Sequence, residues 1–231
     1  MFDNYSGYDS LNADREREAK LMQDKKDRCH KEGKLYSVIF WLTVLGTPVI
    51  VLLAFIGGIA GALFDVMFDS KALLYVIIGG ISLISLAIGI VLAVILFILG
   101  QEESCFRVAA ISYILLVVFE TVSEFLPDGL FKSVLGILTL IAELFYLFEF
   151  INGSMNILAG VDNYLAQSWE TLRKVIIYLF IGLVAIVVLV FIPVIRVIAL
   201  IGAFAAAIAA IVILIWEWVL MFKTARALKN F

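Results

Sequence analysis

Six long apolar runs, separated by short polar segments, set the pattern of this chain. A helix needs about 20 apolar residues to cross the hydrocarbon core of a bilayer, and each run is close to this length or longer. The sequence therefore predicts an all-α integral membrane bundle of six transmembrane helices in three antiparallel hairpins. The predicted spans are about 36–64, 73–99, 107–126, 130–151, 175–192 and 196–222.

Proline marks two places in this pattern, one inside a run and one between two runs. Pro48 lies inside the first span, where it removes a backbone hydrogen bond, and predicts a kink. Pro193 separates the last two spans. A single helix across both would be about twice as long as the bilayer is thick, so two helices with a short turn are expected.

The first 35 residues are polar and predict a cytoplasmic tail followed by a charged helix. Asn12 is a suitable N-cap, and acid-before-base pairs such as Glu16–Lys20 and Asp24–Arg28 support a helix that ends near Gly33. A solvated lead-in to the first span is one interpretation. A helix that binds a partner or lipid headgroups is the other.

The longest loop between spans contains a second polar helix, predicted at about 157–174. Val161, Leu165, Trp169 and Leu172 recur at helical spacing among polar residues. This amphipathic pattern is typical of a helix that lies in the membrane interface, with Trp169 at headgroup depth. A gate or coupling helix is the functional alternative.

Composition agrees with the membrane class and gives no sign of catalysis. Of the 231 residues, 64% are hydrophobic, against roughly half in soluble domains. Neither a phosphate-binding glycine loop nor a GxSxG or HExxH motif is present, and the two cysteines and single histidine lack metal-site spacing. We expect no enzyme activity, cofactor, metal or nucleic-acid partner.

The basic residues predict the orientation. Fourteen of the 17 lysines and arginines fall in the two tails and in the loops after the second and fourth spans, and the other three are Lys71, Lys132 and Arg196. The side rich in basic residues is normally cytoplasmic. The sequence therefore predicts a multi-pass protein of the plasma membrane with both termini in the cytoplasm.

Small residues spaced four apart predict where helices pack closely. In lipid, helices associate where small side chains let their backbones approach. The last span is expected to lie inside the bundle or at a contact between two copies. The predicted packing positions are Gly202, Ala206 and Ala210 in the sixth span, Gly57 and Gly61 in the first, and Ser85 and Gly89 in the second.

Four glutamates in the third and fourth spans are the candidate functional residues. Glu143 lies midway along the fourth span, Glu149 near its inner end, and Glu120 and Glu124 near the outer end of the third span. Carboxyl groups at membrane depth suit a proton or cation pathway, since burial raises their pKa toward neutrality.

The alternative interpretation of these acids is structural. Glu124 and Glu149 would then lie at the interfaces, as would Glu217 in the sixth span. Glu143 and Glu120 would need partners such as Thr139, Ser112 or Tyr113.

Two function classes follow. The first is a non-enzymatic protein for assembly, scaffolding or accessory roles, whose partners are the lipid bilayer and a second copy or another membrane protein. The second is a small transporter or channel-like protein that moves protons or cations. A water-accessible cavity that reaches Glu143 would favour transport, whereas acids sealed by hydroxyl partners, together with an exposed apolar groove, would favour assembly.

Overall fold

The computed structural model describes residues 5–68, 72–127, 129–190 and 196–231, and these residues form helices and no strand. The all-α prediction is therefore confirmed for this part of the chain. The helices are α1 (Tyr5–Phe68), α2 (Ala72–Leu99), α3 (Ser104–Phe125), α4 (Leu130–Leu158), α5 (Asn163–Val190) and α6 (Arg196–Asn230).

Five of the described helices, α2 to α6, are long and apolar enough to cross a membrane. The chain is thus a multi-pass membrane protein. A sixth span, in the apolar half of α1, stays a prediction, because many side chains of that half lie outside the described residues.

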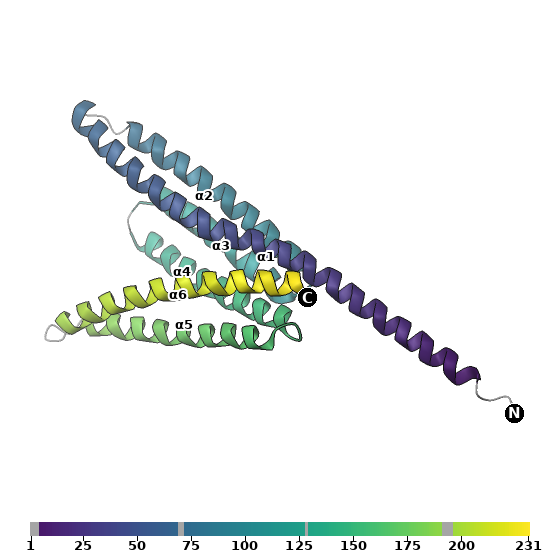
Figure 1. The fold of residues 1–231 in the computed structure, drawn as a ribbon. Coiled ribbons are helices and arrows are strands. Elements are labelled where there is room, and N and C mark those ends of the chain that lie inside the picture. The colour runs from purple at the N-terminus through teal and green to yellow at the C-terminus, as the bar shows by residue number, and fades with distance from the viewer. Residues whose placement is uncertain (1–4, 69–71, 128, 191–195) are drawn as a thin grey trace.

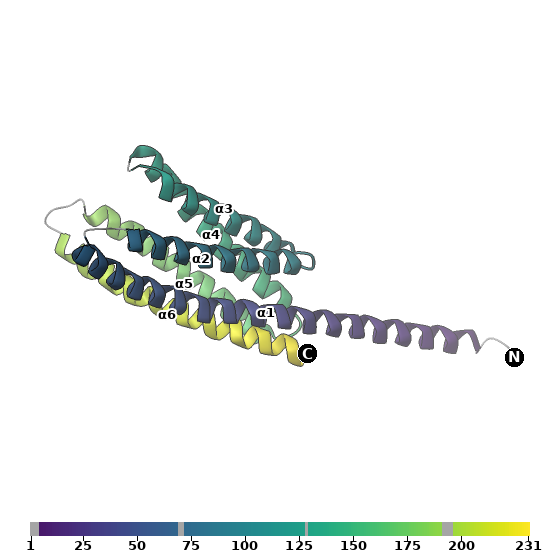
Figure 2. The ribbon, with the colours of Figure 1, turned by 90° about the horizontal axis from the view of Figure 1, so that it is seen from above.

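The helices follow one another around a ring. Each packs against its neighbours in the chain, and α1 closes the ring by packing along α6. Figures 1 and 2 show the helices converging near the C-terminus and spreading apart toward the opposite end. We call the end near the C-terminus, where the helices meet, the converging end. The N-terminal part of α1 extends beyond it, away from the rest of the bundle.

An aromatic cluster fills the ring at the converging end. The Phe150 ring lies 5.7 Å from that of Tyr36, 5.9 Å from that of Phe106 and 5.9 Å from that of Trp169, measured between centroids. The four side chains come from α4, α1, α3 and α5, and all are fully buried. Aromatic pairs at these separations stabilise a structure by about 0.5–1.5 kcal/mol each beyond the area that they bury.

Polar groups within this cluster are paired. The Trp169 indole N–H donates a hydrogen bond to Oγ1 of Thr224 on α6 over 2.9 Å. The hydroxyls of Tyr36 and Ser154 bond to each other, and Ser154 also donates to the carbonyl of Phe150. Such pairing matters because a buried polar group without a partner costs about 1–3 kcal/mol.

Two glycines allow close approach at the converging end. A Cβ atom at Gly153 of α4 would lie 2.8 Å from the Phe106 ring, and one at Gly33 of α1 would lie 2.9 Å from the backbone nitrogen of Lys229 on α6. Both distances are too short for real atoms, so these positions need glycine. Gly33 therefore allows α1 to lie close to α6. It does not end the charged helix, which continues into the first apolar run and through Pro48.

The polar segment between α4 and α5 differs from the predicted interfacial helix at 157–174. Residues 157–158 end α4, and α5 begins at Asn163 and runs unbroken to Val190. Trp169 and Leu172 are fully buried in the bundle core. The reason is that the indole N–H finds its polar partner, Thr224, inside the protein.

Candidate functional site

The candidate site is centred on Glu143, which lies close to the middle of α4. Its side chain is exposed on the surface of the bundle. No hydrogen bond or ion pair from the described residues engages its carboxylate. The predicted partner Thr139 donates instead to the carbonyl of Leu135 in its own helix, over 3.0 Å.

The rotation of α4 explains why Glu143 points outward. Ala142, the preceding residue, is buried against the bundle, and successive residues of a helix point about 100° apart. Gly136, Leu140 and Glu143 are spaced four and three residues apart, so they share one stripe of α4, and all three are exposed. We call this stripe the Glu143 face.

The Glu143 face also has a small residue two turns from the carboxyl group. No heavy atom lies within 4 Å of the place where a Cβ atom of Gly136 would be. The backbone of α4 is therefore accessible at this point. A small residue and a polar residue on one face are the two features that favour association between helices in lipid.

An ionised carboxylate at the bilayer centre is costly. Insertion measurements give about 2.5–3.5 kcal/mol for a charged side chain at the middle of a span. Acids in membrane spans therefore almost always face a bundle interior or a water-filled cavity. Glu143 does not face the interior of this bundle, because its side chain is exposed.

The other three predicted acids have different surroundings. Glu120 is exposed on α3 and interacts with another residue. The side chain of Glu124 lies outside the described residues. Glu149 belongs to the converging end, where its carboxylate lies close to the Cys105 thiol.

Glu217 on α6 differs from the structural interpretation of the sequence, which expected it at the membrane interface. Its carboxylate lies near enough to Tyr36 on α1 and Tyr146 on α4 to interact electrostatically with both, so it faces the inside of the ring. α6 packs antiparallel to α1, with Lys229 beside Gly33. Glu217 is twelve residues back from Lys229, about 18 Å along the helix, which places it within the span. Thr224 lies seven residues later, on the same face of α6. A second polar residue at this spacing is the sequence signal that could have indicated that Glu217 faces inward.

A small cavity lies between α1, α2, α3 and α4 beside Tyr146. Its volume is about 260 Å³, and its lining mixes polar and apolar groups. The rings of Tyr113 and Tyr146 meet here, with centroids 5.1 Å apart. The lining residues are Leu42, Thr43, Gly46, Ser85, Ile88, Leu92, Tyr113 and Tyr146.

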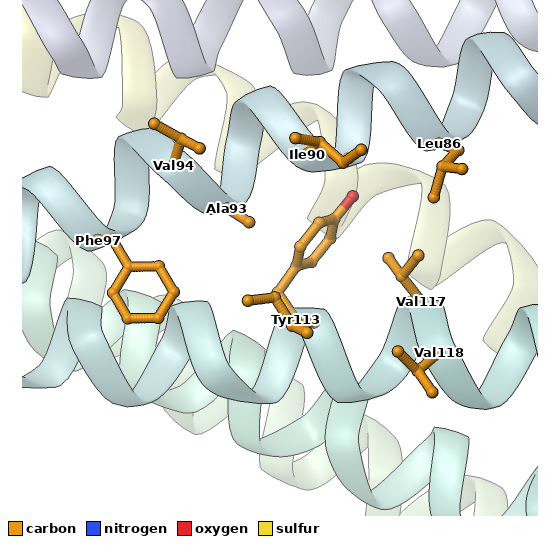
Figure 3. Close-up of a pocket in the computed structure, with 10 residues that line it drawn as sticks. Leu86, Ile90, Ala93, Val94, Phe97, Tyr113, Val117 and Val118 are labelled. Atoms are coloured by element: carbon orange, nitrogen blue, oxygen red, sulfur yellow. The ribbon is translucent and has the colours of Figure 1, made fainter.

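An apolar groove runs between α2 and α3 on the outside of the bundle (Figure 3). Its volume is about 390 Å³. Tyr113 reaches from α3 toward Ile90 on α2 across the groove, and its hydroxyl would lie 3.3 Å from a Cβ atom at Gly89. The lining residues are Leu86, Gly89, Ile90, Ala93, Val94, Phe97, Tyr113, Ile114, Val117 and Val118.

The predicted packing positions have different surroundings. Gly89 packs against Tyr113, and Gly202 packs against Ile186 of α5, whose Cδ1 atom would lie 3.3 Å from an added Cβ. The remaining positions fall into three groups: Gly57 and Ala206 are buried, Ser85 and Ala210 are exposed, and the surroundings of Gly61 lie outside the described residues.

Comparison with known proteins adds no further assignment. No protein-family model, curated protein or solved structure matches this chain. Within the described residues, no group of three or more His, Cys, Asp and Glu side chains could hold a metal ion.

Proposed function

We propose that this chain is a non-catalytic subunit of a larger assembly in the plasma membrane, with both termini in the cytoplasm. In this proposal the Glu143 face binds a transmembrane helix of another protein. The observation that carries it is the exposed carboxyl group at the middle of α4. A partner helix would turn this outward position into the interior of a larger bundle.

The chemistry of Glu143 supports a partner different from this chain. A second copy related by a two-fold axis would bring one Glu143 toward the other. No lysine or arginine lies in the central part of any apolar run of this chain, so a second copy supplies no cation at that depth. The partner that fits has a basic side chain at mid-span, together with a helix face that can approach Gly136.

Photo-crosslinking in native membranes tests the proposal. A photoreactive amino acid replaces Leu140 on the Glu143 face or Val184 on α5, which are 48% and 50% exposed. The two positions have similar depth, because Arg173 of α5 bonds to Asn152 of α4 and the two helices run antiparallel, so that each position lies eleven or twelve residues from this bond. We expect an adduct of discrete mass at position 140 but not at position 184.

A substitution at Glu143 provides the matched control. Glu143→Leu removes the polar contact and should abolish the adduct at position 140, whereas the chain should still insert because leucine is more apolar than glutamate. The same products at positions 140 and 184, or an adduct that persists in Glu143→Leu, would rule out a partner helix that recognises this carboxyl group.

A proton or cation pathway is the second candidate function, and Glu217 favours it. This carboxyl group faces the inside of the ring near Tyr146, which also lines the 260 Å³ cavity. Proton and sodium flux into liposomes that contain the purified protein is the test. Wild-type flux that is lost in Glu217→Gln but kept in Glu143→Gln would support this pathway, and no flux in wild type would exclude it.

A further inference from the structure

A mixed-charge cavity lies at the converging end, outside the Glu143 face. Its volume is about 210 Å³. Lys25, Arg28, Cys29 and Glu32 line it from α1, and Asn156, Ile157 and Ala159 line it from the end of α4 and the residue after it. Glu102 and Glu103 come from the turn between α2 and α3. These elements meet where the spans end, which is the depth of lipid headgroups.

Glu32 is the unusual residue in this lining. It is only 8% exposed. Among the described residues, no hydrogen bond or ion pair holds its carboxylate. A buried carboxyl group needs hydrogen-bond donors, a cation or its own proton, because removing a carboxylate from water costs several kcal/mol.

The two basic residues of the cavity already have other contacts. Arg28 forms an ion pair with Glu102 at 3.8 Å. The Lys25 ammonium lies 3.5 Å from the carbonyl oxygen of Gly160 and 5.2 Å from the centroid of the Phe231 ring. Glu103 accepts a hydrogen bond from the Asn156 amide at 3.0 Å. The lining thus carries three carboxylates and two basic groups, and Glu32 forms no ion pair with either basic group.

We infer that this cavity binds a primary ammonium group next to Glu32, contributed by an ethanolamine phospholipid headgroup or by a soluble amine. An ammonium has three N–H donors and can bond to Glu32 and to a neighbouring carboxylate. For a lipid, Lys25 and Arg28 lie on the same lining and could meet the phosphate. The cavity volume of about 210 Å³ leaves room for several waters and thus for a small ammonium group.

Protonation of Glu32 should compete with the ammonium. The pKa of Glu32 is raised to about 7, first by burial and then by the nearby Glu102 and Glu103, while Arg28 and Lys31 partly offset this. The carboxylate is therefore charged at pH 8 and largely protonated at pH 6. Ammonium binding should be weaker at the lower pH.

Native mass spectrometry of the full chain in detergent tests the inference. The probes are phosphatidylethanolamine, phosphatidylcholine with the same acyl chains, and free ethanolamine. Choline has no N–H to donate, so we expect at least tenfold weaker retention of phosphatidylcholine than of phosphatidylethanolamine at pH 8. Glu32→Gln should remove this preference, and Glu18→Gln, an exposed site farther along the same helix, should keep it.

The results also separate the two sources of the ammonium. Preference for the ethanolamine lipid identifies a headgroup site, whereas binding of ethanolamine without lipid preference identifies a soluble amine. In either case the binding must depend on Glu32 and must be weaker at pH 6 than at pH 8. Equal retention of both lipids together with no ethanolamine binding would overturn the inference, as would a preference unchanged in Glu32→Gln.

Discussion

Single polar residues in this bundle fall into two kinds. Trp169, Thr224 and Ser154 are buried with hydrogen-bond partners inside the chain. Glu143 and Glu32 have none among the described residues. Paired groups hold the helices together, whereas a carboxyl group without a partner is available to another molecule.

The Trp169–Thr224 hydrogen bond should contribute measurably to stability. Thr224→Val leaves the buried indole N–H without an acceptor, and we expect a loss of about 1–3 kcal/mol in the free energy of unfolding. The double variant Trp169→Phe, Thr224→Val should lose less than the sum of the two single variants. Denaturant titration in detergent measures this coupling, and strictly additive losses would show that the bond contributes nothing.

Glu32 should make stability depend on pH. Its pKa is about 7 in the folded chain against an ordinary value of 4.5, so the folded state holds its proton more tightly than the unfolded state. Stability should therefore fall as pH rises from about 4.5 to about 7, by about 1–3 kcal/mol from this residue.

Glu32→Gln should flatten this pH dependence, because glutamine does not titrate. Melting temperatures between pH 5 and pH 8, in detergent without amines, provide the measurement. We expect the variant to match wild type at pH 5 and to melt at a higher temperature at pH 8. Parallel curves for the two proteins would contradict the assigned environment of Glu32.

At the scale of helices, hydropathy predicted where helices form better than how far they extend. The second span was expected at 73–99, and α2 spans Ala72–Leu99. α6 instead continues past the predicted end at 222 to Asn230, because Thr224 and Leu228 are buried against other helices. Contacts between distant segments of the chain decide where such a helix ends. A local sequence pattern does not show these contacts.

The same limit applies to the candidate site. The sequence identified Glu143 by its depth in an apolar run, but its outward direction depends on how α4 packs against α3 and α5. In the sequence, Glu32 does not differ from the other charged residues of a solvated helix. It became notable only because the turn of Glu102 and Glu103, about seventy residues later, lies against α1.

Close packing of α3 against α4 depends on Gly153. Gly153→Ala places a methyl group against the buried Phe106 ring, and we expect a loss of about 1–3 kcal/mol in unfolding free energy. Gly182→Ala on α5 is the control, since nothing lies within 4 Å of its added Cβ. That variant should be neutral or slightly stabilising. Similar melting temperatures for both variants would show that the α3–α4 contact is looser than described.

At the scale of the whole molecule, the ring of helices should place its two ends on opposite sides of the membrane. Gln101, in the turn between α2 and α3, and Pro127, after α3, are both exposed. In a chain without Cys29 and Cys105, we expect Gln101→Cys to react with an impermeant thiol reagent from the cytoplasmic side only. Pro127→Cys should react from the outside only. Reaction of both from one side would contradict the assigned topology.

The proposed assembly is tested most directly by whether lipid reaches the Glu143 face in the native membrane. A genetically encoded spin label replaces Leu140 or Val184, and electron paramagnetic resonance measures the accessibility of each label to oxygen dissolved in the lipid. A covering partner helix predicts low accessibility at position 140, high accessibility at position 184, and a rise at position 140 when Glu143→Leu is added. Equal, high accessibility at both positions would contradict the account, since the carboxyl group of Glu143 would then face lipid alone.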